Sequence, residues 1–282
     1  MMEPTLYVVA TPIGNLRDMV PRAIEVLQTV DVIAAEDTRH SSRLLEHFQI
    51  ATRLVAYHDF SDERQLQYLL DLLLSGSSVA LISDAGTPLI SDPGYRLVRA
   101  AREQGVQVVP IPGACALIAG LSASGLPSDR FSFEGFLPAK SGQRRNVLET
   151  LRREERTMIF YEAPHRILES LADMAEVFGE TRAAAIAREL TKTFETIESG
   201  SLAHLRQFVA DDSNQRRGEI VVLVCGHEPP RDQGLNPEAE RVMEILLQDL
   251  SVKQASELAA RITGLKKKTL YQWALSHKGS SE

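Results

Sequence analysis

Short apolar runs alternate along the first part of the chain with stretches of helical periodicity, and this alternation is the strongest constraint on its fold. Five of the runs have the length of buried strands: 6–10, 32–35, 54–57, 79–82 and 106–111. In the first connecting stretch the apolar residues recur at helical spacing, at Ala23, Val26, Leu27 and Val30. Strands that alternate with helices in this way form mostly parallel sheets with right-handed crossovers. We therefore predict an α/β fold, with a first domain over residues 1–113.

The polar segment 83–94, directly after the fourth run, is a candidate ligand-binding loop. It consists mainly of Ser, Asp, Gly, Thr and Pro, which are residue types that form turns. Connections between a strand and a helix usually have about 2–6 residues, and parallel sheets bind ligands beyond the carboxyl ends of their strands. An ordinary connection is the alternative interpretation. We expect Asp92 and Pro93 to occupy the first positions of the following helix.

From about Asp129 the pattern changes to one that predicts a second α/β domain, over residues 114–226. Residues 130–136 alternate between apolar and polar types, which is typical of a half-exposed antiparallel strand. Further strands are expected, with helices between them, at 157–161, 183–187, 193–200 and 219–225. This order predicts a more mixed sheet. The seam at 112–126 then places the ligand cleft between the two domains.

The last part of the chain, residues 236–282, is predicted to be helical and basic. It follows a linker at 227–236 that contains Pro and Gly, and its helices are expected at 237–250, 252–263 and 267–277. A capping box from Ser251 to Gln254 opens the second of these helices. Between Lys253 and Lys278 there are six Lys or Arg residues and one Glu. Two interpretations stay open: a helix-turn-helix that binds nucleic acid, and a solvated tail that helps to pack a dimer.

The composition is that of a globular protein with an ample core, and missing motifs disfavour several function classes. Apolar residues make up 44% of the chain, and no apolar stretch approaches the ~20 residues that span a bilayer. Cys115 and Cys225 lie far apart in apolar contexts, which favours a reducing cytosol. The motifs of dinucleotide redox, P-loop, zinc-protease and esterase chemistry are missing from the sequence. We expect a cytoplasmic protein that binds no metal and no membrane.

Five short motifs, in this order, carry a resemblance to a known family. They are TPIGNL at 11–16, AEDTRH at 35–40, SDAGTP at 83–88, FYE at 160–162 and RELTK at 188–192. The chain resembles the tetrapyrrole-methylase family of S-adenosylmethionine-dependent enzymes, and within it the bacterial branch that methylates ribosomal RNA. The resemblance covers about residues 6–277. It implies a homodimer with two α/β domains per chain and S-adenosyl-L-methionine in the cleft between them.

The resemblance also implies which residues hold the cofactor, mainly through the backbone of rigid Pro- and Gly-containing loops. They are Pro12, Ile13, Gly14, Ser83, Asp84, Ala85, Gly86, Thr87, Pro88, Ile90, Pro112, Gly113, Cys115, Ala116 and Tyr161. Relatives in the family often carry Gly-Asp-Pro in the central loop, whereas this chain has Gly86-Thr87-Pro88. Thr87 therefore stands where a carboxylate often lies.

The reaction that the resemblance implies is 2′-O-methylation of a cytidine in the decoding region of 16S rRNA, within the small ribosomal subunit. Methyl transfer requires alignment of the attacking hydroxyl, and a base or a positive charge assists because that hydroxyl is a weak acid. The candidates at strand ends are Asp37, Glu162, Glu189 and Lys192. Lys192 could act as a base only with a lowered pKa, and otherwise as an electrostatic stabiliser or phosphate ligand. Structural ion pairs are the alternative for Asp37 with Arg39 and for Arg188 with Glu189.

Basic residues predict where RNA would bind, although the net charge of the chain is −7 and basic runs are usually only solvated faces. The candidates are Arg39, Arg144, Arg145, Lys266, Lys267 and Lys268. Three other functions remain open. The chain could methylate a tetrapyrrole-type small molecule, bind S-adenosylmethionine as a non-catalytic ribosome assembly factor, or act as a DNA-binding regulator.

Overall fold

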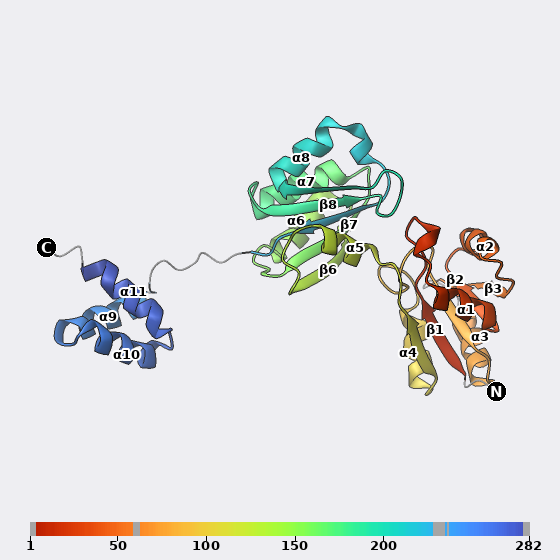
Figure 1. Ribbon diagram of the computed structural model, residues 1–282, viewed down its shortest axis with the longest axis horizontal. Coiled ribbons are helices and arrows are strands. Elements are labelled where there is room, and N and C mark those ends of the chain that lie inside the picture. The colour runs from red at the N-terminus through yellow and green to blue at the C-terminus, as the bar shows by residue number, and fades with distance from the viewer. Residues whose placement is uncertain (1–3, 59–62, 228–234, 236, 279–282) are drawn as a thin grey trace. The chain divides into compact units, whose positions relative to one another are not determined.

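The chain divides into two compact units, residues 1–227 and 228–282. A computed structural model describes residues 4–58, 63–227, 235 and 237–278, and Figure 1 shows their helices and strands. Most of the linker expected at 227–236 lies outside the described residues.

The first unit begins with a five-stranded parallel sheet. Its strands are β1 (Thr5–Val9), β2 (Val32–Ala35), β3 (Arg53–Ala56), β4 (Val79–Ile82) and β5 (Gln107–Ile111). Their order is β3-β2-β4-β1-β5, with every pairing parallel. The third strand in space, β4, is buried along its whole length, because it has a neighbour on each side and helices on both faces. The predicted parallel sheet is confirmed.

Helices cover both faces of this sheet. They are the 3-10 turn η1 (Leu16–Asp18), α1 (Pro21–Thr29), α2 (Thr38–His47), α3 (Glu63–Leu74) and α4 (Tyr95–Glu103). Leu81 packs with α3 and α4 on one face, whereas Ile82 packs with α1 and α2 on the other. Adjacent strand residues point to opposite faces, so the uniformly apolar run of β4 satisfies both cores.

A second five-stranded sheet completes the first unit, and it is mixed as predicted. Its strands are β6 (Phe131–Phe136), β7 (Thr157–Glu162), β8 (Ala183–Arg188), β9 (Thr196–Ser201) and β10 (Ile220–Val224), in the order β6-β7-β10-β8-β9. The prediction that residues 130–136 form an antiparallel strand is wrong. Strand β6 runs parallel to β7, because helix α6 (Ser141–Thr150) carries the chain back across the sheet between them.

The two faces of the second sheet have different cover. On one face lie α6, α7 (Ile167–Phe178) and α8 (Leu202–Asp211), which the 3-10 turn η2 (Ser213–Arg216) follows. On the other face lies the short helix α5 (Ala116–Ala123), together with Ile13 and Ile90 from loops of the first sheet. That face is therefore where the two sheets of the unit meet.

Local backbone contacts determine where helices α2 and α4 begin. Helix α2 begins at Thr38, because the Asp37 side chain accepts hydrogen bonds from the backbone N–H groups of Arg39 and His40. Helix α4 begins only at Tyr95, after Gly94 with a φ of 133°. A β-carbon at residue 94 would lie 2.6 Å from a Leu81 methyl carbon. The chain therefore needs glycine there, and the Asp-Pro pair before it belongs to the loop.

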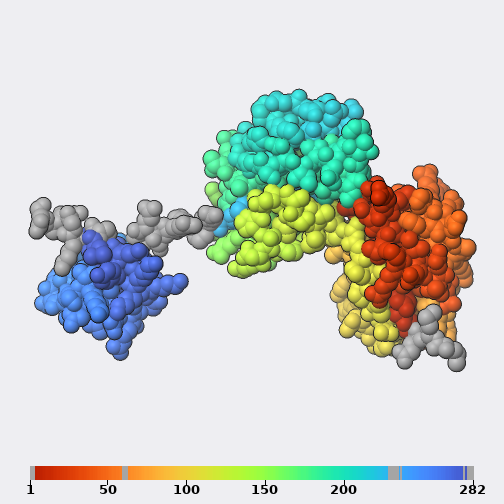
Figure 2. Space-filling view, in the orientation of Figure 1, coloured from red at the N-terminus to blue at the C-terminus, as the bar shows by residue number. Residues whose placement is uncertain are grey.

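The second unit is a bundle of three helices, α9 (Pro237–Asp249), α10 (Val252–Thr263) and α11 (Lys267–Lys278). Figure 2 shows these helices (blue) packed closely on one another. The predicted capping box from Ser251 to Gln254 is present, and Gly264 ends α10 with a φ of 74°. Buried Met243, Leu270 and Trp273 contribute to the core of the second unit. None of the helices in the described parts of either unit is long and apolar enough to span a membrane.

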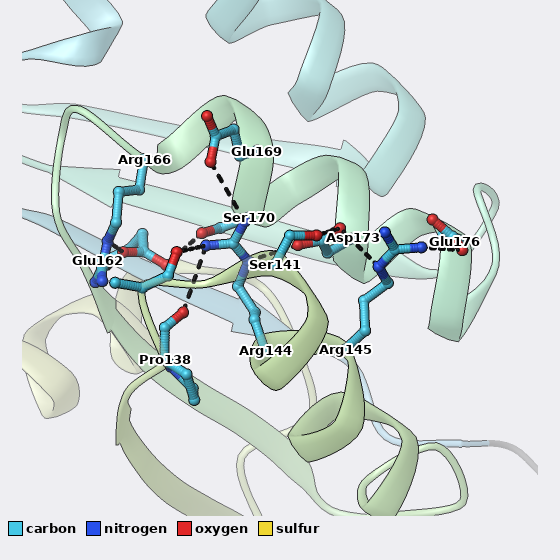
Figure 3. Close-up of polar contacts among 11 residues, drawn as sticks. Pro138, Ser141, Arg144, Arg145, Glu162, Arg166, Glu169, Ser170, Asp173 and Glu176 are labelled. Atoms are coloured by element: carbon cyan, nitrogen blue, oxygen red, sulfur yellow. Dashed lines mark hydrogen bonds and ion pairs between the residues drawn. The ribbon is translucent and has the colours of Figure 1, made fainter.

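A buried ion pair joins α6 to α7, two of the helices that pack on the second sheet. The Arg144 side chain is fully buried, and its Nε donates to Oδ2 of Asp173 at 2.6 Å (Figure 3). Its Nη1 donates to the carbonyl of Ala139 at 3.2 Å, and Ser141 donates to the other oxygen of Asp173. The prediction that Arg144 contacts RNA is therefore corrected: its charge is held inside the protein. The neighbouring Arg145 stays partly exposed.

Substitution of Arg144 should cost much more stability than substitution of Arg145. Arg144→Met leaves the buried Asp173 carboxylate without its main partner, which we expect to lower the free energy of unfolding by about 3–5 kcal/mol. Arg145 is partly exposed and pairs with Glu176 at 2.7 Å and with Asp173 at 3.4 Å, so Arg145→Met leaves Asp173 its pair with Arg144 and should cost at most about 1 kcal/mol. Urea denaturation of both variants measures the difference. Equal losses would contradict the structural role of Arg144.

Candidate functional site

A cavity of about 480 Å³ lies between the carboxyl edge of the first sheet and the α5 face of the second. This volume is typical of small-molecule sites. Its lining comes from the loops after β1, β2, β4 and β5 on one side and from β6, β7, β8, β10 and their loops on the other. The predicted convergence of strand-end loops and the cleft beside the second sheet are both observed.

Backbone hydrogen bonds fasten the loop after β1 to the long loop after β4. The N–H of Thr11 donates to the carbonyl of Gly86 at 2.8 Å, and the N–H of Gly86 donates back at 3.1 Å. The buried Thr11 hydroxyl donates to the Ser83 carbonyl at 3.2 Å. The Thr87 hydroxyl then donates to the carbonyl of Ala114 at 3.0 Å, in the loop after β5. These contacts fix the shape of one wall of the cleft.

Most of the predicted cofactor residues line the cleft. They are Ile13, Asp84, Ala85, Gly86, Thr87, Ile90, Cys115, Ala116 and Tyr161. The others belong to the same loops but do not line it: Pro12, Gly14, Ser83, Pro88, Pro112 and Gly113. A β-carbon at residue 113 would lie 2.9 Å from that of Ala10. Gly113 therefore allows the loop after β5 to approach the end of β1.

Tyr161 is a fixed part of the opposite wall. Its hydroxyl oxygen accepts a hydrogen bond from the N–H of Leu117 at 3.3 Å. Burial raises the pKa of the phenol above its ordinary value, so the hydroxyl stays protonated even where a free Tyr ionises. Its ring makes edge contacts with Phe133 and Phe136, at centroid distances of 4.8 and 5.7 Å.

The structure gives Glu162 a structural position instead of a catalytic one. Its side chain is fully buried, and Oε1 accepts hydrogen bonds from Ala163 N–H at 2.8 Å and from Arg166 Nη2 at 2.7 Å. The Ser170 hydroxyl donates to Oε2 (Figure 3). Both oxygens are occupied by donors of the protein itself, so we no longer expect this carboxylate to take a proton from a substrate. It lines the cleft together with Ala163 and Pro164, and its hydrogen bonds hold this end of β7 in place.

Glu189 and Lys192 form one charged group with Glu219, a cleft residue that the sequence analysis missed. The Lys192 ammonium donates to Glu189 Oε1 at 2.8 Å and to Glu219 Oε2 at 2.9 Å. Burial opposes the charge of Lys192, but these two carboxylates outweigh it and raise the pKa of the ammonium. Burial likewise opposes ionisation of Glu189, yet Lys192 and the Glu219 N–H hold the pKa of that carboxyl below its usual value. Lys192 is therefore a permanent positive charge and not a base.

Two glycines leave the space that the side chains of Glu189 and Lys192 occupy. Gly218 has a φ of 79°, and a β-carbon there would overlap the Glu189 side chain. At Gly14, in the loop after β1, a β-carbon would overlap the side chain of Lys192. The Lys192 side chain thus packs directly on a loop of the first sheet, beside the cleft.

Asp37 lies outside the cleft lining, at the start of α2. Two backbone N–H groups of that helix, those of Arg39 and His40, lower the pKa of its carboxyl. A carboxylate stabilised in this way is a weak proton acceptor. The backbone N–H of Asp37 donates to Oδ1 of Asp84 at 3.1 Å, which connects the loop after β2 to the central loop. Arg39 is exposed beside it.

Asp92 is the titratable cleft residue that sequence reasoning assigned to a helix start instead. It lines the cavity next to Ser91, near the end of the loop after β4. Burial and the nearby Asp84 charge raise the pKa of its carboxyl, against a hydrogen bond with Ser83. Leu89 and Ser91 have φ angles of 74° and 64° in the same loop. Such backbone strain and raised pKa values are typical of functional sites.

The remaining predicted RNA residues are accessible. Arg145 is partly exposed on α6, and Lys266, Lys267 and Lys268 are exposed at the start of α11 in the second unit. Lys267 pairs with Glu257 of α10 at 2.6 Å. A short turn between α10 and α11 and a basic start of the last helix are typical of a helix-turn-helix.

Comparison with known families agrees with this architecture. A family model described as Tetrapyrrole (Corrin/Porphyrin) Methylases matches residues 5–206. A second model, described as RsmI C-terminal HTH domain, matches residues 233–278. The first match covers the first sheet and strands β6 to β9 of the second and ends before β10, and the second match spans the described helices of the second unit.

Two relatives are similar along nearly the whole chain. A protein from Pseudomonas aeruginosa is 58% identical over 282 residues, which is 100% of each chain. A protein from Vibrio cholerae serotype O1 is 55% identical over 276 residues, 98% of this chain and 96% of its own. Both are named Ribosomal RNA small subunit methyltransferase I.

Solved structures share the fold at low identity. Diphthine synthase aligns with a TM-score of 0.59 and 17% identity, over 78% of this chain and 89% of its own. A cobalt precorrin-4 methyltransferase aligns with a TM-score of 0.57 and 14% identity, over 79% of this chain and 95% of its own. The predicted fold of two α/β domains with C-terminal helices is confirmed.

Asp92 and Asp37 should affect stability in opposite directions. A raised pKa means that ionised Asp92 destabilises the folded state at neutral pH. Asp92→Asn should therefore raise Tm at pH 7 by on the order of a few °C. The gain should vanish once the pH falls below the ordinary pKa of Asp, about 3.9, because wild-type Asp92 is then protonated in both states. Thermal unfolding between pH 3 and 7 tests this.

Asp37→Ala is the comparison variant. Its carboxyl has a lowered pKa and caps α2, so its loss should lower Tm at pH 7, and the difference should shrink as the pH falls and the wild-type carboxyl is protonated. If Asp92→Asn also lowered Tm at pH 7, the ionised Asp92 carboxylate would stabilise the folded state instead of destabilising it.

Proposed function

Because the chain belongs to the tetrapyrrole-methylase family, we propose that it transfers a methyl group from S-adenosyl-L-methionine to the 2′-OH of a cytidine in the decoding region of 16S rRNA. The observation that carries this proposal is the identity of 58% over the full chain with a protein named as a methyltransferase of small-subunit ribosomal RNA. The substrate is the small ribosomal subunit, and the protein acts in the cytoplasm as a homodimer.

The cleft fits the cofactor by its size and by the two kinds of surface that line it. Apolar side chains of Ile13, Ile90 and Val221 provide contacts for an adenine or a methionine chain. The fastened loops at 84–87 and 114–116 present backbone groups and a rigid shape to its polar parts. When bound, S-adenosylmethionine supplies a methyl group already activated by a sulfonium.

The residues of the chain then have to orient the attacking hydroxyl and manage its proton. Asp92 is the proposed proton acceptor, because it lines the cleft and its raised pKa gives it more affinity for a proton than an ordinary Asp. Lys192, held protonated by Glu189 and Glu219, would stabilise negative charge on the hydroxyl oxygen or a neighbouring phosphate. Asp37 and Glu162 serve structure.

The second unit is the proposed RNA-docking element. Its exposed lysines at the start of α11 can contact phosphates, which position a nucleic acid without reading its sequence. A small tetrapyrrole-type substrate would need no such basic helices. Arg39 and Arg145 remain candidate contacts on the first unit.

Methyl-labelled S-adenosylmethionine and small subunits from cells lacking this gene provide the direct test. We expect label in 2′-O-methylated cytidine after digestion of the 16S rRNA to nucleosides. Asp92→Asn should lower the rate by about 10²- to 10⁴-fold, the range of a lost general base. Cofactor binding without transfer to RNA would favour a small-molecule methyltransferase or a non-catalytic assembly factor. Failure to bind the cofactor would contradict the assignment of the cleft.

Replacement of Lys266, Lys267 and Lys268 by Gln should weaken binding to the small subunit and leave cofactor affinity unchanged. Loss of up to three phosphate contacts should make the plot of log binding constant against log salt concentration less steep by about 2–3. Filter binding at several salt concentrations measures both quantities. Replacement of Arg22, Arg99 and Arg102 by Gln, on helices of the first unit, gives a control with the same change in charge. Equal effects of the two triple variants would rule out a specific role of α11.

A further inference from the structure

A β-bulge in β6 places Phe136 on the cleft side of the second sheet. The register runs from Phe133 opposite Ile159 to Gly135 opposite Phe160 and Phe136 opposite Tyr161. In a regular strand, Phe133 and Phe136 would point to opposite faces, since they are three residues apart. The extra residue, with Gly135 at a φ of 67°, brings both rings to the same face.

Tyr161 fixes the Phe136 ring in this position. The two rings make an edge contact with a centroid distance of 5.7 Å and an interplanar angle of 64°. Tyr161 is itself held by Leu117 and Phe133. Phe133 belongs to the core between the sheets, whereas Phe136 is 57% exposed although it lines the cavity. Core packing therefore explains Phe133 and leaves the open ring of Phe136 unexplained.

We propose that Phe136 is the stacking surface for the base of the nucleotide that receives the methyl group. This inference rests on the proposed function. A ribose in a folded RNA reaches an enclosed site when its nucleotide is splayed out, and the unstacked base then needs a new π-surface. Phe136 offers one at the open side of the same cavity that contains Asp92 and Glu219.

The position of Phe136 favours the acceptor base over the cofactor. The loops that fit the cofactor project from the first sheet, at 84–87 and 114–116, whereas Phe136 ends the edge strand of the second sheet. A phenyl ring has no hydrogen-bonding group. It would therefore hold any base by its face, and recognition of cytosine would come from other groups.

The test compares Phe136→Ala, Phe136→Leu and Phe136→Trp with the wild type on small subunits lacking the modification. One base–aromatic stack is worth about 1–3 kcal/mol, so Phe136→Ala should lower kcat/KM for RNA by about 5- to 150-fold. Phe136→Trp should keep most of the activity, and Phe136→Leu should lose nearly as much as Ala. The Kd for S-adenosylmethionine should not change in any variant.

Phe131→Ala is the matched control, because Phe131 is also exposed and lies at the other end of the same strand. Its activity should stay within about twofold of the wild type. Activity of the Leu variant equal to that of Trp, a weaker cofactor Kd, or a changed oligomeric state in Phe136→Ala would each overturn the stacking role. A wild type that transfers no label to RNA would overturn the proposed function, and the inference with it.

Discussion

The cleft depends on the pairing of two loops through the backbone of Thr11 and Gly86. Each residue donates to the carbonyl of the other, so the ends of β1 and β4 continue as a small antiparallel bridge beyond the sheet. A φ of 88° at Gly86 lets the central loop turn at that point. Thr87 then carries the connection on to Ala114. Three strand ends are thereby held together by contacts within the protein itself.

Burial and hydrogen-bond partners separate the charged residues of the second sheet into two groups. Glu162 and Arg144 are enclosed: Glu162 ties the end of β7 to Arg166 and Ser170, and Arg144 joins α6 to α7 through Asp173. Glu189 and Lys192 are partly exposed beside the cleft, and the acid on their open side, Glu219, is largely in solvent. A charge can act on a bound molecule only when its own protein partners leave it accessible. That criterion favours Lys192 over Glu162, although both stand at strand ends.

Strands and most helices could be predicted from the sequence, because buried faces leave a periodic apolar pattern. The direction of β6 could not, since alternation shows that one face is exposed but not which way the neighbouring strand runs. For Asp92, a local rule for helix starts competed with a tertiary constraint, the packing of Gly94 on Leu81, and the constraint prevailed. Arg144 illustrates a third limit. A basic residue in a basic segment gives no sign that it will be buried and will pair with a carboxylate 29 positions later.

The distribution of charge within the second unit gives that unit an electric dipole of its own. Helix α9 carries Glu238, Glu240, Glu244 and Asp249 against a single Arg241, whereas the region from Lys253 to Lys278 is strongly basic. In the field of a polyanion, such a body experiences a torque as well as an attraction, and it turns its α10–α11 side forward before contact. An overall negative protein can in this way approach a negatively charged surface in one preferred orientation.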